Sequence, residues 1–274
     1  MAIITLSQIT IYPIKSLAGI SVASCPVVTT GLQYDRQWML VDVDGQFLSQ
    51  RRLPKMAAIK TALIGRHLRI SVPDKADLVL PLMPAQGGEV PCRIWEDACI
   101  ARHVSTEADL WFSDALGQEC RLVYFPDNEI RRVDPNYALA GDQTAFSDGF
   151  PFLLVSENSL ACLNEAMQLP MPMARFRPNV VVSGCAGYAE DSWREIRIGG
   201  IEFRLPKPCS RCSIPTIDPD TAETGKEPLF TLNRTRKWQN KVYFGQNALH
   251  NQTGVLSVGD PVTILQTGEK QPPI

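Results

Sequence analysis

The segment Pro208-Cys209-Ser210-Arg211-Cys212 is the part of the sequence that most clearly suggests chemistry. Two thiols separated by two residues can form a redox pair, supply half of a zinc site, remain buried structural thiols, or offer one thiolate to a soft metal centre. The arginine between them favours the deprotonated thiol through its charge. Spacing alone leaves the structural and the single-ligand interpretations open.

The surrounding sequence weakens the other two interpretations. A zinc site needs two more ligands, but Cys162 and Cys185 have no partner at zinc-finger spacing, and the chain has only three histidines. A thioredoxin-like pair opens a helix, whereas residues 213–217 after the pair are predicted to be extended. The remaining cysteines are predicted to be buried small apolar residues: Cys25, Cys92, Cys99, Cys120 and Cys162.

Strands are the main elements that must position such residues. Short segments rich in β-branched and aromatic residues predict strands at 3–10, 37–43, 122–125, 195–198, 201–205 and 261–265. Residues 179–183 form a continuous apolar run, which predicts a strand buried on both faces. The chain is therefore expected to be mainly β, of α+β type, with an N-terminal β-barrel-like domain packed with a second β-barrel domain and few helices.

Two helices are predicted. The first begins after Ser105 and ends at Gly117, and the second begins after Ser156 and ends before Pro170. The inward face of the first helix is expected to carry Ala108, Trp111, Ala115 and Leu116. Neither helix opens with a glycine-rich phosphate loop, and strands do not alternate regularly with helices, so a doubly wound nucleotide-binding fold is not expected.

Composition excludes several partners. The 274 residues carry a formal charge of -2, which gives no basic surface for nucleic acid. No apolar run is long enough to span a bilayer, and the N-terminus lacks the pattern of a signal peptide. We therefore expect a cytoplasmic protein with neither a nucleic-acid nor a membrane partner. Residues 126–144 are polar and are predicted to join two domains.

A series of short motifs, in this order, resembles the MOSC family (molybdenum cofactor sulfurase C-terminal domain) preceded by its N-terminal β-barrel domain. The resemblance covers nearly the whole chain and is strongest to the mitochondrial amidoxime reducing component and its bacterial relatives. The motifs are Tyr12-Pro13-Ile14-Lys15-Ser16, Tyr34-Asp35-Arg36, Phe146-Ser147-Asp148, Phe176-Arg177-Pro178-Asn179, the segment 208–212, Thr216-Ile217-Asp218-Pro219-Asp220-Thr221 and Phe244-Gly245-Gln246.

This resemblance implies an N-terminal domain at 1–122, a MOSC domain at 123–268 and a tail at 269–274. It also implies a molybdenum cofactor (Mo-molybdopterin) whose metal is bound by one cysteine, at the position of Cys212. A molybdenum atom that already holds a dithiolene accepts a further soft thiolate readily. Cys209 would then support the site or simply be buried. Pyridoxal phosphate is not expected as a cofactor.

Further site residues are implied by position. Lys15, Ser16 and Arg36 lie where the family holds the cofactor's phosphate and pterin, and their cations and hydroxyl suit phosphate oxygens. Arg177, Asn179 and Ser147 match other cofactor-contacting positions. Asp148 matches an aspartate near the metal, which could position substrate or pass protons. Read without the resemblance, the cations are surface charges or salt-bridge partners, and residues 147–149 are a turn.

The function that this resemblance implies is reduction of N-hydroxylated compounds such as amidoximes, by cleavage of the N–O bond. No plant-type ferredoxin signature is present in the sequence. Electrons are therefore expected from a separate iron–sulfur, flavin or haem protein. The alternatives are a carrier of molybdenum cofactor or sulfur without turnover, and a zinc-stabilised β-barrel binding module. Asn247 departs from the aromatic residue of eukaryotic relatives, which affects the predicted substrate preference.

Overall fold

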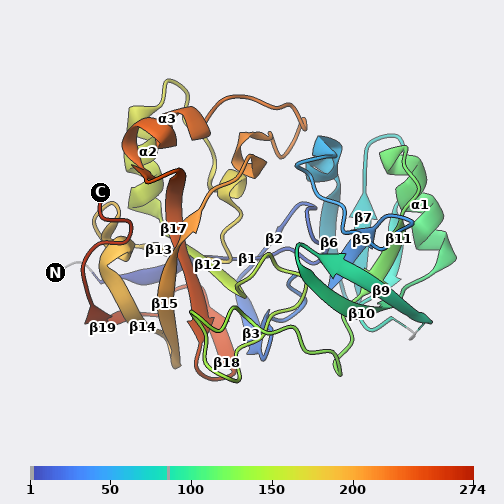
Figure 1. Cartoon of the computed structure of the whole chain (residues 1–274), viewed down its shortest axis with the longest axis horizontal. Coiled ribbons are helices and arrows are strands. Elements are labelled where there is room, and N and C mark those ends of the chain that lie inside the picture. The colour runs from blue at the N-terminus through green and yellow to red at the C-terminus, as the bar shows by residue number, and fades with distance from the viewer. Residues whose placement is uncertain (1–2, 85–86) are drawn as a thin grey trace.

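The largest sheet combines strands from both ends of the chain, as the computed structural model shows over the described residues, 3–84 and 87–274 (Figure 1). Only β12 and β13 run parallel, joined through a helix; the other pairings are antiparallel. In spatial order the strands are β19 (Val262–Thr267), β14 (Trp193–Ile198), β15 (Ile201–Ser210), β17 (Lys241–His250), β12 (Phe152–Ser156), β13 (Val180–Ser183), β1 (Thr5–Ile11) and β2 (Ile20–Val22), with β16 (Lys237–Trp238) beside β17.

Three smaller sheets complete the fold. One of them pairs β18 from late in the chain with β3 near its beginning. The sheets are β5 (Trp38–Val41), β11 (Arg121–Tyr124), β10 (Asp97–His103) and β9 (Glu89–Ile94); β18 (Gly254–Ser257), β3 (Ser24–Val28) and β4 (Gly31–Leu32); and β6 (Lys60–Ile64), β7 (His67–Ser71) and β8 (Leu78–Pro81). The mainly β architecture is thus confirmed, while the domain boundaries at 122/123 and 268/269 stay predictions.

Both predicted helices are present with the predicted caps. In α1 (Thr106–Leu116) the Ser105 hydroxyl accepts from the Ala108 amide, and Gly117 adopts φ 65° after the last turn. Ser156 caps α2 (Glu157–Ala166) in the same way. The buried face of α1 contains Phe112, whereas the predicted Trp111 is only partly buried.

A third helix was not predicted from the sequence. α3 (Leu229–Thr235) begins after Pro228, and the Glu227 carboxylate accepts from the Thr231 amide of its first turn at 3.0 Å. A glutamate before a proline is not one of the usual sequence signals for a helix start. The extended conformation predicted for 213–217 was wrong, because Ile214–Thr216 forms a 3-10 turn with Pro215 near its start. The other 3-10 turns are Pro54–Ala58, Met173–Phe176 and Ala189–Ser192.

The thiols divide into two groups. Cys25, Cys92, Cys99 and Cys120 are buried as predicted, but the prediction for Cys162 was wrong. Cys162 is exposed because it lies at the edge of the buried face of α2, beside Ser159 and Leu163, with its sulfur toward the surface loop at Gly187. Within residues 3–84 and 87–274, every helix is too short or too polar to cross a bilayer.

Candidate functional site

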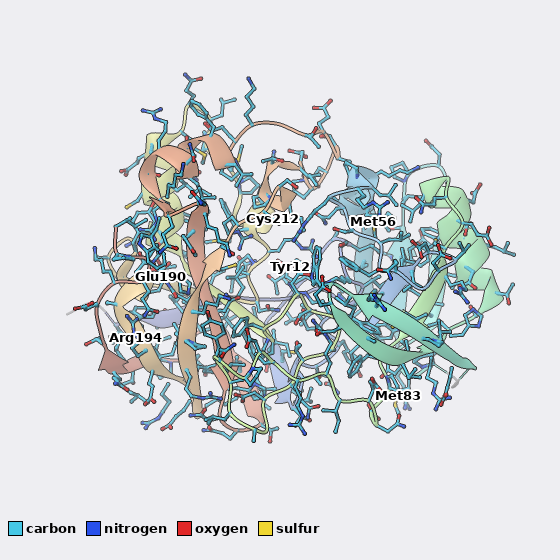
Figure 2. The ribbon with its side chains drawn as sticks, in the orientation of Figure 1. Tyr12, Met56, Met83, Glu190, Arg194 and Cys212 are labelled. Carbon is cyan, nitrogen blue, oxygen red and sulfur yellow. The ribbon has the colours of Figure 1, made fainter. Side chains whose placement is uncertain are left out.

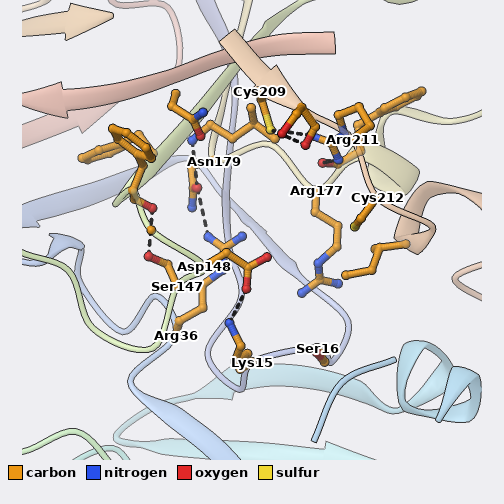
Figure 3. Close-up of a pocket in the computed structure, with 18 of the residues that line it drawn as sticks. Lys15, Ser16, Arg36, Ser147, Asp148, Arg177, Asn179, Cys209, Arg211 and Cys212 are labelled. Carbon is orange, nitrogen blue, oxygen red and sulfur yellow. Dashed lines mark hydrogen bonds and ion pairs between the residues drawn. The ribbon is translucent and has the colours of Figure 1, made fainter. Parts of the chain in front are cut away.

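One pocket collects all the site residues predicted from the sequence (Figure 3). The pocket is open to solvent on one side, and its lining combines apolar side chains with polar and charged ones, as small-molecule sites do. Figure 2 shows Tyr12 and Cys212 near the middle of the molecule, between the large sheet and the strands of the N-terminal half. The residues of the pocket lining that were predicted from the sequence are Lys15, Ser16, Arg36, Ser147, Asp148, Arg177, Asn179 and Cys212.

The two thiols enter the pocket from the end of β15. The predicted strand stops at residue 205 because Pro206 and Pro208 interrupt its alternation, but β15 continues to Ser210 through two register shifts. Arg211 donates to the Cys209 sulfur at 3.2 Å and to the Phe176 carbonyl at 2.7 Å. The guanidinium therefore contacts Cys209 directly, while the half-buried Cys212 has no side-chain hydrogen bond to the described residues.

Lys15 and Ser16 come shortly after β1, in a segment that lies beside the start of β5. The Lys15 amide donates to the Trp38 carbonyl at 2.8 Å, and Ser16 adopts the left-handed φ of 69°. The Lys15 side chain is buried, and its ammonium donates to the Phe146 carbonyl (2.8 Å) and to Asp148 Oδ1 (2.6 Å). Burial lowers the pKa of Lys15, although the Asp148 charge opposes that shift.

Asp148 is surrounded by donors although its side chain is 56% exposed. Besides Lys15, the Trp95 indole donates to its Oδ1 at 3.3 Å, and Arg51 lies 3.7 Å from its Oδ2. The partial loss of water around Asp148 opposes ionisation, but the charges of Lys15 and then Arg51 outweigh it and hold the pKa of Asp148 well below its ordinary value. Asp148 therefore remains a carboxylate near neutral pH and acts as a hydrogen-bond acceptor.

Arg36 and Arg177 are organised by one aromatic ring. Their guanidinium carbons lie 4.3 and 4.2 Å from the centroid of Tyr12, a cation–π arrangement. The Tyr12 hydroxyl donates to the Pro178 carbonyl at 3.2 Å, and burial raises the pKa of Tyr12 to about 12. Both arginines have left-handed φ values, 48° and 57°, a strained conformation typical of functional sites.

Asn179 and Ser147 have most of their hydrogen-bonding capacity occupied by the protein. Asn179 Oδ1 accepts from Arg36 (2.9 Å) and from the Leu153 amide (3.3 Å). The Ser147 hydroxyl donates to the Phe150 carbonyl at 2.8 Å. These two residues shape the pocket wall, whereas the Ser16 hydroxyl has no hydrogen bond to the described residues.

Several pocket residues were missed in the sequence. Arg51 and Arg211 add two cations to the lining, and the buried Arg131 binds the backbone beneath Ser147 and Asp148. Arg211 was noted only for its charge, and Arg131 only as part of a polar joining segment. No local pattern distinguishes Arg51 from the neighbouring surface Arg52, because its position depends on the distant Trp95, whose ring lies 4.4 Å from the Arg51 guanidinium.

The composition of the pocket fits an anionic, sulfur-binding group. Among the described residues of its lining, Asp148 is the single carboxylate, and the buried Asp35 pairs with Arg36 from outside the lining. The Nε atoms of Arg51 and Arg211 are buried and have no partner among the described residues. Two thiols lie in the same wall and provide soft ligands. This is the donor set that a phosphate-bearing dithiolene metal cofactor needs. The cations of the lining are Lys15, Arg36, Arg51, Arg177 and Arg211.

Comparison with known proteins agrees with the motif resemblance. Residues 3–119 match the MOSC N-terminal beta barrel domain, and residues 141–263 match the MOSC domain. Mitochondrial amidoxime-reducing component 1 is 36% identical in Mus musculus and in Homo sapiens, over 95% of this chain and 82% and 83% of those proteins. Mitochondrial amidoxime reducing component 2 of Rattus norvegicus is 34% identical, over 94% of this chain and 82% of that protein.

Proposed function

Since this chain belongs to the MOSC family, with the N-terminal beta barrel domain before the MOSC domain, we propose that it reduces N-hydroxylated compounds at a molybdenum cofactor held in the pocket. The observation that carries the proposal is the meeting of Cys212 with five cationic side chains in one pocket. The relatives are named for amidoxime reduction, which supports the same substrate class here.

The chain's own residues would hold the cofactor in two ways. Cys212 would provide the thiolate for the metal, because its sulfur has no hydrogen bond to the residues that the structure describes, unlike that of Cys209. Arg36 and Arg177, kept in place by Tyr12, and the free hydroxyl of Ser16 provide donors for phosphate and pterin oxygens. The bound cofactor supplies the two-electron redox change of the reaction.

Asp148 has a positioning role in this scheme. Its carboxylate is ionised, and Lys15 and Trp95 both donate to Oδ1, so Oδ2 remains as an acceptor for an N–H or O–H group of the substrate. The net reaction consumes two electrons and two protons and converts an N–OH group into N–H and water. Because the pKa of Asp148 is low, the two protons come from solvent rather than from a protonated Asp148.

The electrons come from a separate protein in this proposal, an iron–sulfur, flavin or haem donor. The relatives' names place them in mitochondria, while the cytoplasmic location stays a prediction from the sequence. Asn247, which lines the pocket, would contribute hydrogen bonding rather than stacking to substrate selection.

Metal and pterin analysis of the purified protein tests the proposal. We expect molybdenum in the wild type and in Cys209→Ala, and its loss in Cys212→Ala. The loaded wild type should reduce benzamidoxime with a reduced dye as donor. Equal molybdenum in both variants would contradict the ligand assignment. Loaded protein that never turns over an N-hydroxylated substrate would contradict the reductase and favour the carrier hypothesis.

A further inference from the structure

Two thiols face each other in the hairpin of β9 and β10, outside the pocket. Cys92 and Cys99 are direct cross-strand partners, and their sulfur atoms lie 3.3 Å apart. Each residue is 5% exposed. No protein segment separates the two sulfurs, so only a small approach is needed to join them.

The environment makes the two thiols unequal. The hydrogen bond between the two sulfurs lowers the pKa of Cys99, and the charge of Arg131 adds to that effect, while burial opposes it. The same hydrogen bond and burial raise the pKa of Cys92. Cys99 is therefore the thiol that ionises first, and a thiolate is the form that reacts with oxidants.

We propose that Cys92 and Cys99 form a modification site for small hydroperoxides, which oxidise the pair to a cross-strand disulfide. The Cys99 thiolate attacks hydrogen peroxide, the O–O bond breaks, and a sulfenic acid and water result once a proton is taken up. The Cys92 sulfur then displaces hydroxide from the sulfenic acid and loses its proton, which gives the disulfide and a second water. Two thiols are oxidised by two electrons, and one peroxide is reduced.

The geometry favours a small oxidant and a local change. Because both sulfurs are buried, a peroxide molecule reaches them more easily than a protein or a bulky disulfide does. The S–S bond of about 2.05 Å requires the sulfurs to approach by roughly 1.2 Å from their present 3.3 Å, which side-chain rotation and a slight strand movement can supply.

Oxidation of Cys92 and Cys99 would also change the position of a residue that contacts the pocket. The turn between the two cysteines carries Trp95, whose indole donates to Asp148 and whose ring lies against Arg51. Trp95 adopts a left-handed φ of 54°, so its orientation depends on the geometry of the turn. The site is independent of the proposed function, because its chemistry needs neither cofactor nor substrate.

Peptide mapping of the full chain after peroxide treatment tests the proposal. Trypsin cleaves after Arg93, so a Cys92–Cys99 disulfide joins peptides 76–93 and 94–102. We expect the joined peptide, two hydrogens lighter than the sum of its parts, and its loss after dithiothreitol. It should be absent in Cys99→Ser and present in Cys120→Ser, which removes a buried thiol that contacts a hydroxyl instead. Recovery of both peptides unlinked, while other cysteines oxidise, would overturn the proposal.

The link to Trp95 has its own measurement. The indole N–H resonance of Trp95, identified by its loss in Trp95→Phe, should shift on oxidation of the wild type and stay in place in treated Cys99→Ser. A disulfide that forms without moving this resonance would refute the effect at the pocket.

Discussion

The loop that carries Ser147 and Asp148 is held by one buried arginine, and we expect Arg131→Met to loosen it. The Arg131 guanidinium donates to the carbonyls of Ala145 (3.0 Å), Ser147 (2.5 Å) and Asp148 (3.2 Å). Its Nε also donates to Asp97 at 2.7 Å. Methionine fills similar space but donates none of these bonds, so the three carbonyls lose their partner.

The magnitude follows from these contacts. Hydrogen bonds from a charged group contribute about 1.5–3 kcal/mol each, so the three carbonyl bonds set an upper limit of roughly 5–9 kcal/mol. Asp97 is about half exposed, and its ion pair adds little. The three bonds share one side chain and the freed carbonyls regain water, so we expect a loss of about 3 kcal/mol, at the lower end for a broken buried charge contact. For a chain of this size that corresponds to a melting temperature lower by about 6–12 °C.

Urea unfolding of Arg131→Met and Arg132→Met gives the comparison. Arg132 is adjacent and exposed, and its guanidinium contacts a single carbonyl, that of Ala140. We expect Arg132→Met to remain within about 0.5 kcal/mol of wild type, as for most surface substitutions. If the two variants lost the same stability, Arg131 would not be what holds the pocket loop.

Two further predictions concern the pocket and its supporting strands. The pKa of Asp148 is depressed in the folded protein, so the pairing of Asp148 with Lys15 stabilises the protein above the ordinary carboxyl pKa of about 3.9 and is lost as the pH falls toward the folded pKa. The difference in unfolding free energy between wild type and Asp148→Asn, measured by urea unfolding, should therefore shrink below about pH 4. A difference that grows there would contradict the ion pair. Gly245→Ala should lower the free energy of unfolding by about 2–4 kcal/mol, because Gly245 has φ 80° and an added Cβ would lie 2.8 Å from the Leu154 carbonyl oxygen. Gly200→Ala is the control, because an added Cβ there meets nothing within 4 Å. Equal Tm values for the two variants would contradict this reasoning.

Helix caps and apolar runs within the sequence correctly predicted several helices and strands. Helix α1 has its cap at Ser105 and its stop at Gly117, and the apolar run at 179–183 became β13, buried in the large sheet. Helix α3 and the far end of β15 were missed, because their conformations are set by packing against β17 and by register shifts around prolines. These long-range contacts leave no periodic trace in the sequence.

For the pocket, too, several residues could be predicted from the sequence but their long-range contacts could not. Motif resemblance placed eight residues from five separate segments, and the fold brings all of them into one lining. The contacts that determine their roles were not predictable: Lys15 is committed to Asp148, Asn179 to Arg36, and Arg211 to Cys209. Each pairing joins residues that lie on different elements or depends on a bulge, so residue type alone does not specify it.

The charges in the pocket give a reason why ligand binding and stability should be coupled. Burial, and then the nearby charge of Arg36, lower the pKa of Arg177 to about 10, although Tyr12 opposes the shift. Arg36 forms an ion pair with the buried Asp35 at 2.5 Å, and this carboxylate offsets part of the repulsion between the two guanidiniums that lie on one ring. Their left-handed backbones cost roughly 1–3 kcal/mol each. An anionic group between these side chains converts the repulsion into attraction while it uses geometry that the fold has already fixed. The strain is thus stored in the pocket wall, and a bound anion should stabilise the whole chain by linkage.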